Sequence, residues 1–153
     1  MTKSQEDTIE HIAKVQFYLS ATITNLHERS TVHDRSKLEE PELSGYEGLS
    51  QAAQGVNYGT QEYRDALAPF KEIIQHHYAH NRHHPEHWPD GINDMTLLDI
   101  IEMLCDWKAA HDRKGGPFGP SLAANLRRFK MSDQLGAIIV NTASELGWMD
   151  GTN

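Results

Sequence analysis

The stretch TLLDIIEMLCDWKAAHDRKGGP, residues 96–117, decides the fold class. Its apolar residues recur at the three- and four-residue spacing that lines one face of an α-helix. They are Leu97, Leu98, Ile101, Leu104 and Trp107. Two glycines and a proline at positions 115–117 form a strong stop signal for a helix. The pattern therefore predicts a helix from about Thr96 to Arg113.

The same periodicity predicts further helices elsewhere in the chain, and no segment shows the sustained alternation of a strand. A shorter helical piece should carry residues 33–37 and weaken before Pro41. We expect an all-α fold, a compact helical bundle of about five to six helices that forms one domain over residues 1–153. The longer predicted helices span residues 8–26, 61–79 and 132–146. Pro69 should kink the second, and the third should be capped by Ser132 and ended by Gly147.

Two segments are predicted to be irregular because they are rich in residues that favour turns. Residues 42–61 contain Gly45, Gly48, Gly55 and Gly59, so we expect a loop with at most short helical turns. This loop could close over a ligand as a lid. Residues 81–93 are rich in His, Pro and Gly and should fold back toward the helix before them.

Composition excludes several classes of function. The formal net charge is −8, which disfavours a protein that grips a long nucleic acid by charge. The one cysteine, Cys105, precludes an internal disulfide and suits a reducing compartment. The polar first ten residues do not resemble a signal peptide, and no apolar run is long enough to span a membrane. We expect a cytoplasmic protein with no membrane partner, and a homo-oligomer is compatible with the sequence.

Histidines and acidic residues follow one another in an order that suggests a metal site built from helices. Six of the ten histidines fall within residues 76–87. A divalent cation needs neutral imidazoles and carboxylates that converge from several elements. The series is His11, His33-Asp34, the histidine cluster, and then Asp99, Glu102 and Asp106 on one stripe of a helix.

Helical phase favours two of these histidines as inward-facing ligands. His77 is in phase with the apolar residues of its predicted helix, whereas His76 follows the more polar face. His11 precedes Val15 by four residues, which places it on the expected buried side of the segment 8–26.

This order resembles the HD-domain superfamily of metal-dependent phosphohydrolases. The run His33-Asp34-Arg35-Ser36-Lys37 is similar to the HDxxK signature of HD-GYP cyclic-dinucleotide phosphodiesterases. The run His83-His84-Pro85-Glu86, followed by Asp90-Gly91, resembles their HHE and DG segment. No GYP triplet follows Gly91 and the chain is short, so a cyclic dinucleotide is not the implied substrate. Residues 77–108 look like an uncharacterised family of small phage and bacterial HD-like proteins.

The resemblance implies a metal centre with two divalent cations (Mn, Fe, Ni, Co, Mg or Zn). Its core ligands would be His33, Asp34 and Asp106, with His11 as the fourth. His77 and His84 would complete a second position that Asp34 bridges. His83 is the alternative to His84, and Asp99 is the alternative to Asp106; Asp99 is otherwise a solvated or capping charge.

The resemblance also implies roles in catalysis for Asp34, Lys37 and Glu102. Lys37 would hold a phosphate oxygen as a point charge. Glu102 would orient the water or accept its proton. Asn81 is a candidate for substrate contact. The other candidates for shaping the substrate pocket are Arg29, Tyr46, Tyr58, Lys108 and Arg128.

Three functions fit these residues. The leading expectation is metal-dependent hydrolysis of a nucleotide or another small phosphate ester by metal-activated water, with a small phosphorylated substrate as partner. A di-iron oxygenase would use the same ligands and would take up oxygen without releasing phosphate. A non-catalytic binding module stabilised by metal would melt at a lower temperature after chelation and would show no turnover.

Overall fold

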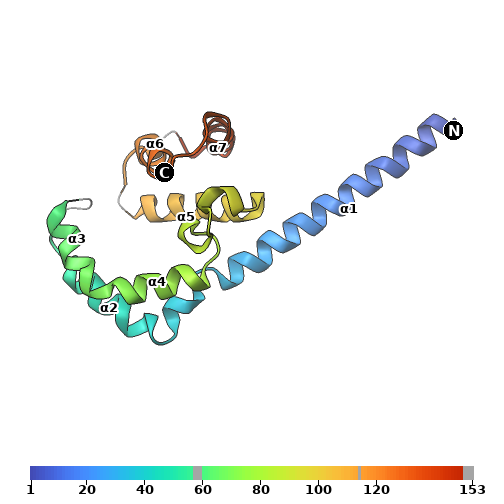
Figure 1. Cartoon of the computed structure of the whole chain (residues 1–153). Helices are drawn as coiled ribbons and strands as arrows, with labels where there is room; N and C mark the ends of the chain where they lie inside the picture. Colours follow the sequence, from blue (N-terminus) through green and yellow to red (C-terminus); the bar gives the residue numbers. More distant parts are fainter. Residues whose placement is uncertain (57–59, 114, 150–153) are drawn as a thin grey trace. The chain divides into compact units, whose positions relative to one another are not determined.

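Every regular element among the described residues is helical, which confirms the all-α prediction. The computed structural model describes residues 1–56, 60–113 and 115–149 (Figure 1). The chain separates into two compact units, Met1–His33 and Asp34–Asn153. The organisation as one domain stays a prediction. No helix in the described ranges is long and apolar enough to cross a membrane.

The first unit is a single helix, α1 (Lys3–Val32), which is longer than the predicted segment 8–26. It starts early because Thr2 and Gln5 form a capping box: Thr2 Oγ1 accepts from the Gln5 amide, and Gln5 Oε1 accepts from the Thr2 amide. No residue of α1 is buried. Within this unit His11 is exposed, because the unit contains no second layer against which α1 could pack, and its predicted role as a buried ligand stays a prediction.

In the second unit, α2 (Glu42–Ala52) packs against α4 (Lys71–His80), so the predicted loop over residues 42–61 is wrong for its first half. A Cβ atom on Gly45 would lie 2.6 Å from Ile73, and one on Gly48 would lie 2.9 Å from Phe70. These two glycines let the helices approach closely and do not form turns. The close packing brings the start of α2 beside α4.

The predicted helix over residues 61–79 is divided as its proline suggested. α3 (Gln61–Leu67) ends at a short 3-10 turn, η2 (Ala68–Phe70), that contains Pro69, and α4 follows directly. Residues 57–59 lie outside the described residues, and with them the pocket candidate Tyr58 and the lid residue Gly59.

The core of the second unit lies among the last three helices, α5 (Leu97–Asp112), α6 (Phe118–Arg128) and α7 (Asp133–Glu145) (Figure 1). Ser132 caps α7 as predicted, and Gly147 follows that helix with a left-handed φ of 70°. The buried apolar residues are Ile100, Met103, Leu104, Phe118, Leu122, Ile139 and Ala143.

Helix α6 was not among the predicted elements. Pro120 and the glycines before it suggest a loop in the sequence. In the structure Pro120 lies in the first turn of α6, where proline is tolerated because the N–H groups of that turn have no partner within the helix.

Candidate metal centre

Four side chains of the second unit converge on one position: Asp34, His77, His83 and His84. Each offers one ligand atom, and these atoms lie within 4.8 Å of one another. His77 Nε2 is 2.9 Å from His84 Nε2 and 3.3 Å from Asp34 Oδ1, and His83 Nε2 is 3.5 Å from the same oxygen. His77 comes from α4, the other two histidines from the loop that follows it, and Asp34 from the residue before the short helix η1 (Arg35–Leu38).

Glu42 orients the ring of His77 through the ring nitrogen that faces away from the other three residues, Nδ1. It is the first residue of α2 and is fully buried, with 0% of its surface exposed. His77 Nδ1–H donates to Glu42 Oε2 over 2.8 Å, and His76 Nδ1–H donates to Oε1 over 2.8 Å. The Ser36 hydroxyl also donates to Oε2, over 2.9 Å. Because a carboxylate only accepts, the proton of neutral His77 sits on Nδ1, and the lone pair of Nε2 points toward the other donors.

The electrostatics of the site favour neutral imidazoles beside an ionised carboxylate. Burial alone would raise the pKa of Glu42, but the hydrogen bonds from His76, His77 and Ser36 outweigh it and lower that pKa. Burial lowers the pKa of His77 despite the hydrogen bond to Glu42. Burial, together with His83 and His77 nearby, lowers the pKa of His84 to about 3. Neutral imidazole is the form that binds a metal ion.

Asp34 enters the site through an unusual backbone conformation. Its φ is 54°, in the left-handed region, so the predicted helix over residues 33–37 begins only after it, at Arg35. Aspartate tolerates this region better than most residues. Lys37 Nζ lies 2.6 Å from Asp34 Oδ2, while Oδ1 faces the histidines. Lys37 therefore orients the aspartate, and its predicted contact with a phosphate stays a prediction.

Charged groups on α5 hold the loop that carries His83 and His84. Glu102 Oε1 lies 3.3 Å from His83 Nδ1, which favours the tautomer whose lone pair is on Nε2. The neighbouring Arg82 pairs with Asp99, with Nε 2.7 Å from Oδ1 and Nη2 3.2 Å from Oδ2. Asp99 also caps α5, as the sequence suggested, but it is buried and not solvated.

The separations of the four donors fit a divalent cation. Donors bound at the usual ~2.0–2.1 Å around a tetrahedral zinc ion lie ~3.3 Å apart. Three of the donor separations are 2.9, 3.3 and 3.5 Å, close to this value, and the others are within 4.8 Å. With its lone pair on Nε2, His77 can approach His84 Nε2 so closely only with a proton or a cation between the rings. The four residues therefore could hold a metal ion.

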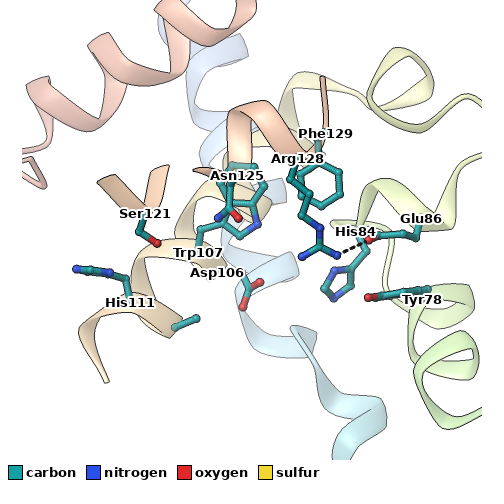
Figure 2. Close-up of a pocket in the computed structure, with 11 residues that line it drawn as sticks. Tyr78, His84, Glu86, Asp106, Trp107, His111, Ser121, Asn125, Arg128 and Phe129 are labelled. Atoms are coloured by element: carbon teal, nitrogen blue, oxygen red, sulfur yellow. Dashed lines mark hydrogen bonds and ion pairs between the residues drawn. The ribbon is translucent and has the colours of Figure 1, made fainter. Parts of the chain in front are cut away.

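A cavity of about 260 Å³ opens beside the metal centre. It is bordered by His84 on the side of the centre and by residues of α5 and α6 on the other, with Asp106 on its wall (Figure 2). A ligand atom of Asp106 lies within 4.8 Å of one of His83, so the cavity and the centre adjoin. The lining residues are Tyr78, His84, Glu86, Asp106, Trp107, Ala110, His111, Ser121, Asn125, Arg128 and Phe129.

The structure brings together only part of the predicted ligand set. Asp34, His77 and His84 converge as expected, and His83 joins His84 although the sequence treated the two as alternatives. Asp106 borders the cavity and is not one of the four converging residues, so its role as a ligand stays a prediction.

His11 and His33 belong to the first unit, at positions far apart along it. They are 22 residues apart (33 minus 11), and α1 spans nearly all of that interval, which corresponds to ~33 Å along the helix axis. They cannot bind one ion within a chain, so the predicted pairing of these two is wrong. His33 as a ligand stays a prediction.

Asn81 is buried and forms hydrogen bonds within the protein. It is only 7% exposed, and its amide donates to Ser36 Oγ and to the carbonyl of His77. These hydrogen bonds brace the end of α4 against the segment before α2. Asn81 is also absent from the lining of the described cavity, and its contact with substrate stays a prediction.

Glu102 and Asp106, both on α5, lie in different positions relative to the cavity. Glu102 contacts His83 and is absent from the described cavity lining, and its predicted role with the water stays a prediction. Asp106, one turn further along α5, is an acidic residue that lines the cavity.

The remaining pocket candidates lie in different places. Arg29 is on α1, where its Nε donates to Asn25 Oδ1. The ring of Tyr46 packs edge-on against His77, with 5.5 Å between the ring centroids. Lys108 donates to Asp112 on the same helix. These three are not in the described cavity lining, whereas Arg128 is.

Glu42 was not among the predicted site residues. Its segment looked like a glycine-rich loop, and only the close approach of α2 to α4 reveals that it faces His77. The one available signal was the spacing of Glu42, Gly45 and Gly48, three residues apart on one helical face.

Replacing Glu42 tests whether it supports the metal centre. Glu42→Gln is expected to weaken zinc affinity by about 10- to 100-fold, as loss of a carboxylate behind a histidine ligand typically does. Competition with a fluorescent zinc chelator measures this. Glu47→Gln is the matched control, since Glu47 lies on the same helix and is exposed. Equal affinities in the Glu42→Gln variant and the unchanged protein would contradict the assigned role.

Comparison with known proteins gives a family but no activity. The model of DUF5662, a family of unknown function, matches residues 1–145. No curated protein and no solved structure matches the chain.

Proposed function

Because the chain belongs to the DUF5662 family, whose function is unknown, we propose an activity from the chemistry of its own residues: metal-dependent hydrolysis of a small phosphate ester. The observation that carries the proposal is the convergence of Asp34, His77, His83 and His84 at the edge of a cavity. A carboxylate and three imidazoles make a donor set that suits zinc, iron, nickel, cobalt or manganese better than magnesium. Four donors around one position support one cation there, and the second cation implied by the sequence would need further donors.

When bound, a divalent cation held by these four donors would acidify a water molecule only at a fifth, open coordination position, and it would neutralise charge that develops on the phosphoryl group. The contribution of the surrounding residues would be to position the metal donors. Glu42 and Glu102 hold the rings of His77 and His83, and Lys37 holds Asp34, so the donors are fixed before any ligand arrives.

Asp106 would accept a proton from the attacking water, a role supported by its position in the cavity lining near His83. In the reaction, the water oxygen forms a bond to phosphorus and the bond from phosphorus to the alcohol oxygen breaks. The proton taken by Asp106 then passes to the leaving alcohol. In this proposal Asp106 takes the role that the sequence assigned to Glu102.

A screen of phosphate esters tests the proposal. Metal-free protein, loaded in turn with Zn, Mn, Co, Ni and Fe, is assayed for phosphate release from p-nitrophenyl phosphate, sugar phosphates and nucleoside monophosphates. We expect release that depends on the metal and is lost in Asp34→Asn, a variant of nearly the same shape. Stoichiometric metal binding with no phosphate release from any ester would overturn the proposal, and oxygen uptake by the iron-loaded protein would favour an oxygenase.

A further inference from the structure

Arg128 is the cationic side chain at the edge of the cavity. Among the described lining residues it is the only arginine, and none is a lysine. It lies at the end of α6 and is about half exposed, with 49% of its side-chain surface accessible. Its guanidinium lies over the ring of Phe129, 4.8 Å from the ring centroid. This cation–π contact restricts the positions that the guanidinium can adopt.

Glu86 holds Arg128 toward the metal centre. Arg128 Nη2 is 3.0 Å from Glu86 Oε1, and Glu86 belongs to the short helix η3 (Pro85–His87), directly after His84. Figure 2 shows the guanidinium turned toward Glu86 and His84. The ion pair therefore joins α6 to the loop that carries two of the proposed ligands.

The same face of α6 presents further polar groups to the cavity. Ser121, Asn125 and Arg128 are spaced by four and three residues, so they form one stripe, and all three line the cavity. A hydroxyl and an amide are suited to the hydroxyl groups of a substrate, whereas a guanidinium is suited to its phosphate.

From this arrangement we propose that Arg128 binds the phosphoryl oxygens of the substrate in the cavity beside the metal position, while Ser121 and Asn125 face its hydroxylated organic part. The inference rests on the proposed function. A guanidinium has five N–H donors, so it can bind a phosphate while it stays near Glu86. Lys37, to which the sequence assigned the phosphate, pairs with Asp34 and is not among the lining residues that the structure describes.

The size of the cavity narrows the substrate class. At about 260 Å³ it lies just below the ~300–1,000 Å³ common for ligand pockets. It suits a phosphate monoester of a small hydroxylated alcohol and is too small to enclose a dinucleotide.

Binding of inorganic phosphate, the product of the proposed reaction, tests the role of Arg128 without requiring turnover. Calorimetric titration of zinc-loaded protein is expected to give a Kd about 10- to 100-fold higher for Arg128→Gln than for the unchanged protein, the usual effect of a lost charge-assisted hydrogen bond. Arg127→Gln is the matched control, because Arg127 is the preceding residue of the same helix and does not line the cavity as described. Its Kd should stay within about twofold, as expected for a substitution away from the site.

Glu86→Gln separates phosphate binding from a purely structural ion pair. It keeps a hydrogen-bond acceptor for Arg128 but removes the competing negative charge, so phosphate affinity should rise by about threefold. A loss as large as that in Arg128→Gln would overturn the inference, as would an unchanged Kd in Arg128→Gln or no phosphate binding to the zinc-loaded protein.

The outcomes separate this inference from the proposed function. If esters are hydrolysed and Arg128→Gln binds phosphate normally, only the role of Arg128 fails. If phosphate binds through Arg128 and no ester is hydrolysed, the proposed function fails while the anion site stands.

Discussion

Replacing His77 with alanine is expected to lower the affinity for zinc by at least ~100-fold and to abolish metal-dependent phosphate release. His77 is 1% exposed, and its Nε2 lies within 3.3 Å of two other proposed ligand atoms. Mutating residues that only support a ligand already costs ~10- to 100-fold in metal affinity, so loss of a ligand should cost at least as much. Metal content by mass spectrometry after dialysis, on protein without a histidine tag, measures the effect.

Two further variants make the result interpretable. Asp34→Asn should lose zinc to a similar degree while it keeps the shape of the side chain, which guards against a loss caused by misfolding of His77→Ala. His80→Ala should bind zinc normally, because His80 is exposed on the same helix and lies outside the four-residue group. His80 belongs instead to a second group, with Glu42 and His76, that could hold an ion. Loss of zinc in His80→Ala with retention in His77→Ala would place the ion there and contradict the proposed centre.

Removing the metal is expected to lower the melting temperature by about 5–10 °C. A ligand that is present at ~100 times its Kd and binds only the folded state adds ~2.7 kcal/mol of stability. For a protein of this size, each kcal/mol corresponds to ~2–4 °C in Tm. The metal would join the segment before η1 to α4 and the loop after it, which are far apart along the chain. Differential scanning calorimetry with and without a chelator measures the shift.

The control for this prediction is Asp34→Asn, which should melt at nearly the same temperature with and without metal. A shift of the same size in that variant would show that the metal acts elsewhere on the protein. An unchanged Tm in the original protein would mean that the four side chains do not bind metal tightly in the folded state.

Periodicity and capping signals predicted much of the fold. Ser132 is the N-cap of α7, as predicted, and Thr96, the predicted first residue of its helix, is the N-cap of α5. Where glycine or proline interrupts a segment, the same rules failed. Gly45 is a contact residue in a helix, and Pro120 occupies a first turn, so α2 and α6 were missed. Local sequence cannot tell a glycine that forms a turn from one that admits a neighbouring helix.

The candidate site was predictable where a ligand belongs to a regular element. His77 shares a helical face with apolar residues, which identified it correctly as inward-facing. His83 and His84 could not be ranked, because the path of a loop does not follow from periodicity. Asp34 lies outside its expected helix owing to its left-handed backbone, and Glu42 reaches His77 only through the packing of two helices.

X-ray absorption spectroscopy of protein loaded with one equivalent of zinc tests the central claim most directly. The four converging residues predict a first shell of nitrogen and oxygen only, at ~2.0–2.1 Å, with the multiple-scattering pattern of three imidazoles. A sulfur shell at ~2.3 Å, which would implicate Cys105, or a shell with fewer than three imidazoles would contradict the centre formed by Asp34, His77, His83 and His84.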